Sequence, residues 1–161
     1  DKVYNIGKTD RAILLEMLAI KGIKNPNAKK LEVSLKHVGE IGARYIKEHG
    51  VTAVPNVDRF VDVLKRKSYV GLLTGNCRER ALAKIKGLGL QIYFQPVIGA
   101  FGEEAEKRSD LVSIAMKDAE KNRNKICEKR RLLDWRQRSR HLVRKRSRRK
   151  DHFSRNWARK L

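Results

Sequence analysis

Residues 69–76, YVGLLTGN, decide the fold. Their first five residues form an apolar run without the alternation of a half-exposed strand. Such a run is typical of a strand buried on both faces of a parallel sheet. The run ends at Thr74-Gly75-Asn76, and a helical pattern follows at once, with Ala81, Ile85 and Leu88 on one face. A strand that leads directly into a helix is the repeating unit of α/β proteins, so this is the expected class.

The flanking segments extend this pattern. Residues 97–101, VIGAF, predict a second and shorter strand, and residues 108–120 predict another helix. Upstream, a Val-Pro-Asn turn at residues 54–56 leads into a short helix. One face of that helix is expected to carry Val57, Phe60, Val61 and Leu64.

Two amphipathic helices are predicted in front of this α/β region. Thr9 is a good N-cap for the first helix, Asp10 suits its first turn, and Gly22 ends it. The second helix is expected over about residues 28–48. Its apolar stripe consists of Leu31, Leu35, Val38, Ile41, Tyr45 and Ile46. Two consecutive helices of this kind are expected to pack as a helical hairpin.

The charge of the chain is concentrated at its end. The formal net charge of the 161 residues is +21, and residues 121–161 contribute +15 of it, with 18 Lys+Arg against 3 Asp+Glu. A split of this size indicates segments of different kinds. The expected organisation is a helical segment over 1–53, an α/β core over 54–121 and a basic extension over 122–161.

Several classes of protein are excluded. Cys77 and Cys127 are too few for a disulfide framework, which favours a reducing, cytoplasmic location. No apolar run approaches the roughly 20 residues that a membrane-spanning helix needs, so no membrane partner is expected. The cysteines lack metal-ligand spacing with the four histidines, which are His37, His49, His141 and His152. Residues 103–106, EEAE, are interpreted as a solvated acidic loop in preference to a metal site.

The turn Thr74-Gly75-Asn76 is the strongest candidate for a binding site. It follows a buried strand at the edge where open α/β sheets bind their ligands. A hydroxyl and free backbone N–H groups at the start of a helix can hold an anion, and a plain strand-to-helix turn is the alternative. Arg108 is placed at the start of the last helix, where a cation opposes the helix dipole. It is either a solvated cation or a partner for a nearby anion.

Taken together, residues 5–120 resemble the haloacid dehalogenase superfamily, particularly its phosphoglycolate-phosphatase-like branch with a helical cap. The segments that carry the resemblance are residues 7–18 (GKTDRAILLEML), 54–64, 71–76 (GLLTGN) and 99–111, which includes Arg108. The resemblance implies part of a Rossmann-like core and Mg²⁺-dependent hydrolysis of a small phosphorylated metabolite through an aspartyl-phosphate. It gives Thr74 a hydrogen bond to the phosphoryl group, Gly75 and Asn76 backbone contacts, and Arg108 a charge-balancing role.

Two parts of that family's pattern are absent. Its nucleophile is an aspartate in a D-x-D-G-T strand before the cap, whereas Asp1 here is followed by Lys2-Val3. Its magnesium loop, G-D-x-x-x-D, should follow the helix that begins near Arg108. A truncated chain without these parts is expected to be inactive and to bind Mg²⁺ weakly at best.

The basic extension has three interpretations. Residues 134–141, when reverse-translated and shifted by one base, can read G-D-S-V-H-D, so a frameshift near residues 121–131 would explain the missing loop. Alternatively, the extension is a basic arm that binds nucleic acid, in which Trp135, Phe153 and Trp157 stack on bases. The third possibility is a solvated tail without a role. Preference for a particular RNA would distinguish the arm from a non-specific polycation.

Overall fold

Helices dominate the part of the chain that the structure describes. The computed structural model describes residues 6–124, and the chain divides into two units, residues 1–122 and 123–161. The first unit holds both the segment expected as a cap and the segment expected as a core. In chain order its elements are α1 (Asp10–Ile20), α2 (Ala28–His49), α3 (Val57–Lys67), β1 (Leu72–Leu73), α4 (Arg78–Gly87), the short 3₁₀ helix η1 (Gln91–Tyr93), β2 (Gly99–Ala100) and α5 (Asp110–Lys121).

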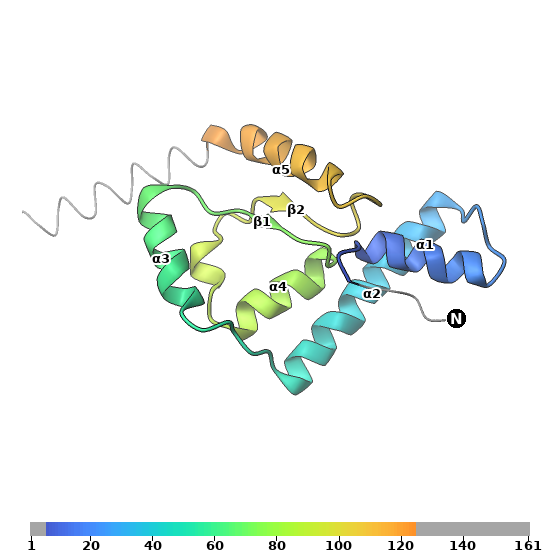
Figure 1. Ribbon diagram of the computed structural model, residues 1–161, viewed down its shortest axis with the longest axis horizontal. Coiled ribbons are helices and arrows are strands. Elements are labelled where there is room, and N and C mark those ends of the chain that lie inside the picture. The colour runs from blue at the N-terminus through green and yellow to red at the C-terminus, as the bar shows by residue number, and fades with distance from the viewer. Residues whose placement is uncertain (1–5, 125–161) are drawn as a thin grey trace, which may run out of the picture. The chain divides into compact units, whose positions relative to one another are not determined.

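The sheet is parallel, as the apolar run predicted. Leu72 pairs with Gly99, and Leu73 pairs with Ala100. Because a parallel pair needs a crossover, α4 and η1 connect the two strands. Figure 1 shows α5 on one side of this sheet and α4 on the other. The α/β class is therefore confirmed for residues 6–124 as a β1–α4–β2 unit with helices on both sides.

Both strands are shorter than the sequence predicts, and β1 is less buried. The run over 69–73 contributes only Leu72 and Leu73 to the sheet, and the Leu73 side chain is 43% exposed. Burial on both faces requires neighbouring strands and helices, and the sheet within residues 6–124 has two strands. The backbone N–H of Gly99 in β2 donates to the Asp118 carboxylate, with Gly99 N 3.0 Å from Asp118 Oδ2. This side chain takes the place that a carbonyl of a further strand could have.

The first two helices begin where their capping residues predict. Thr9 Oγ1 accepts a hydrogen bond from Ala12 N at 3.1 Å, which confirms Thr9 as the N-cap of α1. At the start of α2, Asn27 Oδ1 accepts from Lys30 N at 3.2 Å. Side-chain oxygens at these positions satisfy N–H groups that have no partner inside the helix.

The predicted apolar stripe of α2 is wrong in part. Ile41 and Tyr45 are 57% and 58% exposed, while Leu31 and Leu35 are buried. Helix α2 packs against α4 at Gly42. A Cβ at this position would lie 2.7 Å from Arg80 Cδ, so the close contact requires glycine. The two helices approach along this small residue, which turns Ile41 and Tyr45 toward the surface.

The apolar face of α3 is covered unevenly, since Val61 is buried and Phe60 is 63% exposed. One further expectation needs correction. The last helix begins at Asp110, so Arg108 lies in the loop before it instead of in its first turn. None of the helices within residues 6–124 has the length and apolar character to span a membrane.

The buried apolar side chains form two clusters. The first joins α1 and α2 to the start of α4, and it consists of Leu31, Leu35 and Cys77 with Leu14, Leu15, Leu18 and Val38 around them. The second joins α3, η1 and β1 to α4, and it consists of Val61, Leu90 and Phe94 with Val57, Val70, Leu72, Ile85, Leu88 and Tyr93 around them. The first cluster therefore fixes the helical hairpin against the segment that follows β1.

Candidate functional site

Three loop segments meet beyond the carboxyl ends of β1 and β2. They are residues 7–11, 74–78 and 101–106. Three backbone hydrogen bonds join them: Asp10 N to Gly75 O (2.7 Å), Arg11 N to Gly102 O (3.1 Å) and Gly102 N to Asn76 O (2.8 Å). This is the edge at which open α/β sheets bind ligands, and here it is built from cross-linked backbone.

Thr74 presents a hydrogen-bond donor at this edge. Its Oγ1 accepts two hydrogen bonds from Asn76, one from the backbone N at 3.2 Å and one from Nδ2 at 3.0 Å. A hydroxyl can also donate one hydrogen bond. Within residues 6–124 the hydroxyl proton of Thr74 has no acceptor. The predicted site residues Thr74 and Asn76 are therefore in direct contact, and one donor is left over.

The backbone N–H groups at the start of α4 are largely engaged by carboxylates of the chain itself. Cys77 N donates to Asp10 Oδ2 at 2.7 Å, and Arg78 N donates to both carboxylate oxygens of Glu103 at 3.1 and 3.2 Å. The expected cradle of free N–H groups is thus closed at these positions. Gly75 N–H remains without an acceptor in the described part of the chain.

Asp10 is a structural carboxylate, a role that the sequence pattern did not indicate. It is 7% exposed, and besides accepting from Cys77 N it lies 3.8 Å from Arg80 Nη1. From the sequence, Asp10 is expected only to complement the dipole of its own helix. Its partner is 67 residues away along the chain, so no local pattern marks the contact.

Arg108 has no bond to the Thr74 turn among residues 6–124. Its side chain is exposed, and its guanidinium makes no hydrogen bond or ion pair there. Two other cations near the turn are already engaged. Lys8 Nζ contacts both carboxylate oxygens of Glu16 at 2.6 and 2.7 Å, and the Arg78 guanidinium lies 4.4 Å from the centre of the Phe101 ring.

A cleft of about 600 Å³ opens beside the three loops. Its lining consists of Arg11, Glu32, Leu35, Lys36, Glu79, Glu103, Glu104 and Ile114. Four carboxylates against two cations make this cleft unfavourable for a phosphate. Burial raises the pKa of Glu103, although the N–H groups of Glu103 itself and of Arg78 act in the opposite direction. The cleft includes neither Thr74 nor Arg108, so it is distinct from the predicted site.

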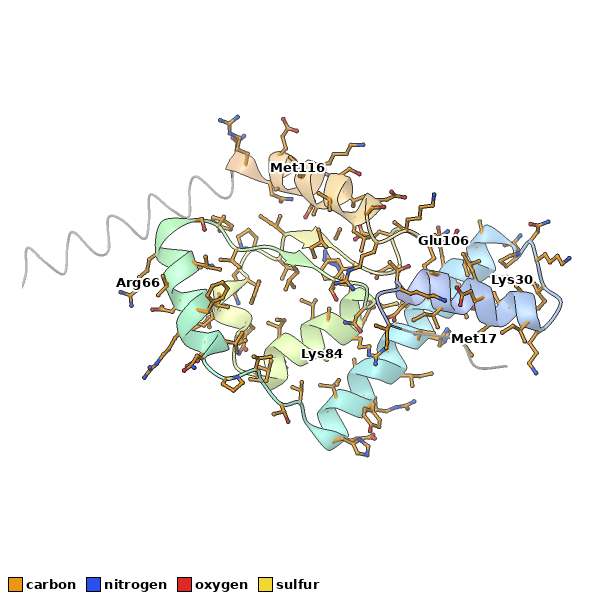
Figure 2. The ribbon with its side chains drawn as sticks, viewed as in Figure 1. Met17, Lys30, Arg66, Lys84, Glu106 and Met116 are labelled. Carbon is orange, nitrogen blue, oxygen red and sulfur yellow. The ribbon has the colours of Figure 1, made fainter. Side chains whose placement is uncertain are left out.

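The acidic loop is only partly solvated. Glu106, which is labelled in Figure 2, is exposed. Glu104 is also exposed, but its carboxylate accepts from Phe101 N at 2.6 Å, and Glu103 is half-buried. Both glutamates thus bind backbone N–H groups. No three His, Cys, Asp or Glu side chains in the described ranges are grouped so that they could hold a metal ion.

The remaining predicted residues are easily placed. His37 and His49 are exposed on α2, where each Nδ1 lies near the carbonyl oxygen four residues earlier, at 2.9 and 3.0 Å. Cys127, His141, His152 and the aromatic residues proposed for nucleic-acid stacking lie outside the described residues. The frameshift hypothesis concerns the same region.

We expect the Cys77 thiol to be unreactive and to lower the free energy of unfolding at alkaline pH. It is 1% exposed, and its pKa is raised first by burial, then by the charges of Asp10 and Glu103. Above the ordinary thiol pKa of about 8.5, the unfolded chain loses this proton while the folded chain keeps it. The thiol should therefore lower the free energy of unfolding by about 1.4 kcal/mol per pH unit above that value.

This is measured by urea unfolding of the natural chain and of Cys77→Ala at several pH values from about 8 to 10. Lysines and tyrosines titrate equally in both chains, so the difference isolates the thiol. Parallel pH profiles for the two chains would show that Cys77 ionises as readily in the folded state as in the unfolded state.

Comparison of the sequence and the structure with known proteins finds no matching family model, no matching curated protein and no matching solved structure. The interpretation of the site therefore depends on its own geometry and on the residues that form it.

Proposed function

We propose that residues 6–124 recognise the phosphoryl group of a small phosphate ester at the Thr74 turn. The observation that carries the proposal is the hydroxyl proton of Thr74, which has no acceptor in the described part of the chain while Oγ1 itself accepts two hydrogen bonds. Asn76 thereby orients the hydroxyl, and the free proton is directed to an acceptor from outside. A phosphoryl oxygen is a strong acceptor of this kind.

The position of the turn favours an anion over a neutral ligand. Gly75 N–H lies in the same turn without an acceptor among residues 6–124. The turn also precedes the N-terminus of α4, whose dipole favours negative charge, although the carboxylates of Asp10 and Glu103 already bind its first N–H groups. The Gly75 backbone is packed closely against residues 8–10, since a Cβ at this position would lie 2.5 Å from Lys8 O and Gly75 O accepts from Asp10 N at 2.7 Å. Donors that are held in place before a ligand arrives lose little entropy on binding.

The reaction class comes from the resemblance. We propose that the chain is part of a haloacid dehalogenase-type phosphohydrolase of the phosphoglycolate-phosphatase-like branch, whose parent forms an aspartyl-phosphate with Mg²⁺. The β1–α4–β2 unit with helices on both sides supports part of a Rossmann-like core, and the α1–α2 hairpin supports part of a helical cap.

This chain itself is proposed to bind phosphate without hydrolysing it. Asp10 is joined to the Thr74 turn through its backbone N–H, and its buried carboxylate oxygens are directed at Cys77 N and Arg80. It is therefore unsuited to attack a phosphorus atom. The carboxylates of residues 6–124 also do not fit a magnesium site, since Glu103 and Glu104 accept from backbone N–H groups and no three ligands are grouped.

Substitution of Thr74 tests the proposal. Thr74→Val keeps the shape and removes the hydroxyl, whereas Thr74→Ser keeps the hydroxyl and serves as the matched control. Loss of a hydrogen bond to a charged group costs about 1.5–3 kcal/mol, so Thr74→Val should bind inorganic phosphate at least about tenfold more weakly. Affinity is measured from the shifts of the Gly75 and Asn76 amide signals in an NMR titration, which excludes phosphate bound elsewhere on this basic chain.

Thr74→Ser is expected to stay within about threefold of the natural chain, because one hydroxyl is exchanged for another. Equal affinities for Thr74→Val and Thr74→Ser would contradict the proposal. So would the absence of any phosphate-dependent shift at these amides in the natural chain.

A further inference from the structure

Lys84 is connected to the Thr74 turn through a single amide group. It projects from α4 one turn after Arg80 and is labelled in Figure 2. Its Nζ lies 3.5 Å from Asn76 Oδ1, at the outer limit of a hydrogen bond. The other end of the same amide, Asn76 Nδ2, donates to Thr74 Oγ1 at 3.0 Å. The Lys84 ammonium and the Thr74 hydroxyl therefore contact opposite ends of the Asn76 amide.

Lys84 has no ion-pair partner among residues 6–124. The side chain is half-buried, and no carboxylate lies within 4.0 Å of its ammonium in the described ranges. Its neighbours differ in this respect, since Lys8 is paired with Glu16 and Arg80 lies 3.8 Å from Asp10. Burial and the charge of Arg80 lower the pKa of Lys84, and Asp10 opposes them. Asp10 lies beyond ion-pair distance of Lys84, so a bound oxyanion would supply the direct partner that this half-buried cation lacks.

We infer that Lys84 binds the same phosphoryl group as the Thr74 hydroxyl and neutralises part of its charge. The inference rests on the proposed function and names the cation of that site. An ammonium has three donors, and the one contact of Lys84 at 3.5 Å leaves it free to turn toward phosphoryl oxygens. Lys84 thus supplies the positive charge that the resemblance assigned to Arg108, whose exposed side chain makes no hydrogen bond or ion pair among residues 6–124.

The test compares two lysines on one helix. Lys84→Gln removes the ammonium near Asn76, and Lys86→Gln makes the same charge change at an exposed position of α4. Each variant is titrated with inorganic phosphate while the Thr74, Gly75 and Asn76 amide signals are followed. Lys84→Gln should bind at least about tenfold more weakly, since charge-assisted hydrogen bonds are the strong ones. Lys86→Gln should change the affinity by about twofold or less, because exposed charges are screened.

A second measurement needs no variant. In the natural chain, the Lys84 side-chain signal should shift with phosphate at the same midpoint as the Thr74 amide. A Lys84 signal that stays unmoved while the Thr74 amide shifts would overturn the inference, as would equal affinities for Lys84→Gln and Lys86→Gln. If Thr74→Val loses binding in that case, the proposed function survives and only the role of Lys84 fails. If neither Thr74→Val nor Lys84→Gln changes the affinity, the proposed function itself fails.

Discussion

Replacing Gly102 with alanine is expected to unfold residues 6–124 or to destabilise them by more than about 3 kcal/mol. A Cβ at this position would lie 1.8 Å from Gly75 O and 2.4 Å from Gly75 C. Both are backbone atoms, and neither segment can retreat easily. Gly102 N donates to Asn76 O at 2.8 Å, and Gly75 O accepts from Asp10 N at 2.7 Å. The close approach of the two loops therefore requires glycine.

Urea unfolding followed by far-UV circular dichroism measures this effect. Gly22→Ala is the matched control. Gly22 has a φ of +82°, and a Cβ at this position would have no atom of the described residues within 4 Å. Alanine at position 22 would cause no clash, but it would have to adopt the left-handed backbone conformation, which should lower the free energy of unfolding by about 1–2 kcal/mol. A Gly102→Ala chain that is no less stable than Gly22→Ala would show that the loops are further apart than in this structure.

Truncation of Leu111 to alanine is the second change with a large expected effect. Leu111 is 0% exposed, and it lies in the first turn of α5, the helix that packs on β2. Removing a fully buried leucine side chain leaves a cavity and typically costs about 2–5 kcal/mol. Because the sheet within residues 6–124 has only two short strands, we expect the loss to fall at the upper end of this range.

Val112→Ala provides the control for Leu111. Val112 is the next residue of α5 and is 50% exposed, so its truncation should cost less than about 1 kcal/mol. Both variants are compared by the midpoint of urea unfolding. Similar midpoints for the two variants would mean that α5 does not pack on the sheet through Leu111.

The proposed phosphate site should respond to both substitutions. The three loops are joined to one another by backbone hydrogen bonds, and two of them follow directly from β1 and β2. Their geometry therefore depends on the packing beneath them. Loss of phosphate-dependent shifts in Leu111→Ala at urea concentrations that leave Val112→Ala unaffected would connect the site to this packing.

Local features of this protein were predictable from the sequence. Thr9 caps α1 through an N–H only three residues away, and the apolar run before Thr74 leads into a parallel pair as expected. The contact between Thr74 and Asn76 spans two residues. Such interactions depend on spacing within one turn or one strand, and this spacing is written in the chain itself.

Only the tertiary structure decided which charges reach the site. Asp10 contacts Cys77 N across 67 residues, and Lys84 reaches back over two turns to Asn76, while the exposed Arg108 makes no hydrogen bond or ion pair among residues 6–124. The exposure of Ile41 on α2 was likewise set by the close approach of α4 at Gly42. A periodic pattern fixes that a helix is amphipathic, but the partner it packs against decides which side chains are covered. That partner is brought in by long-range packing, which no local spacing encodes.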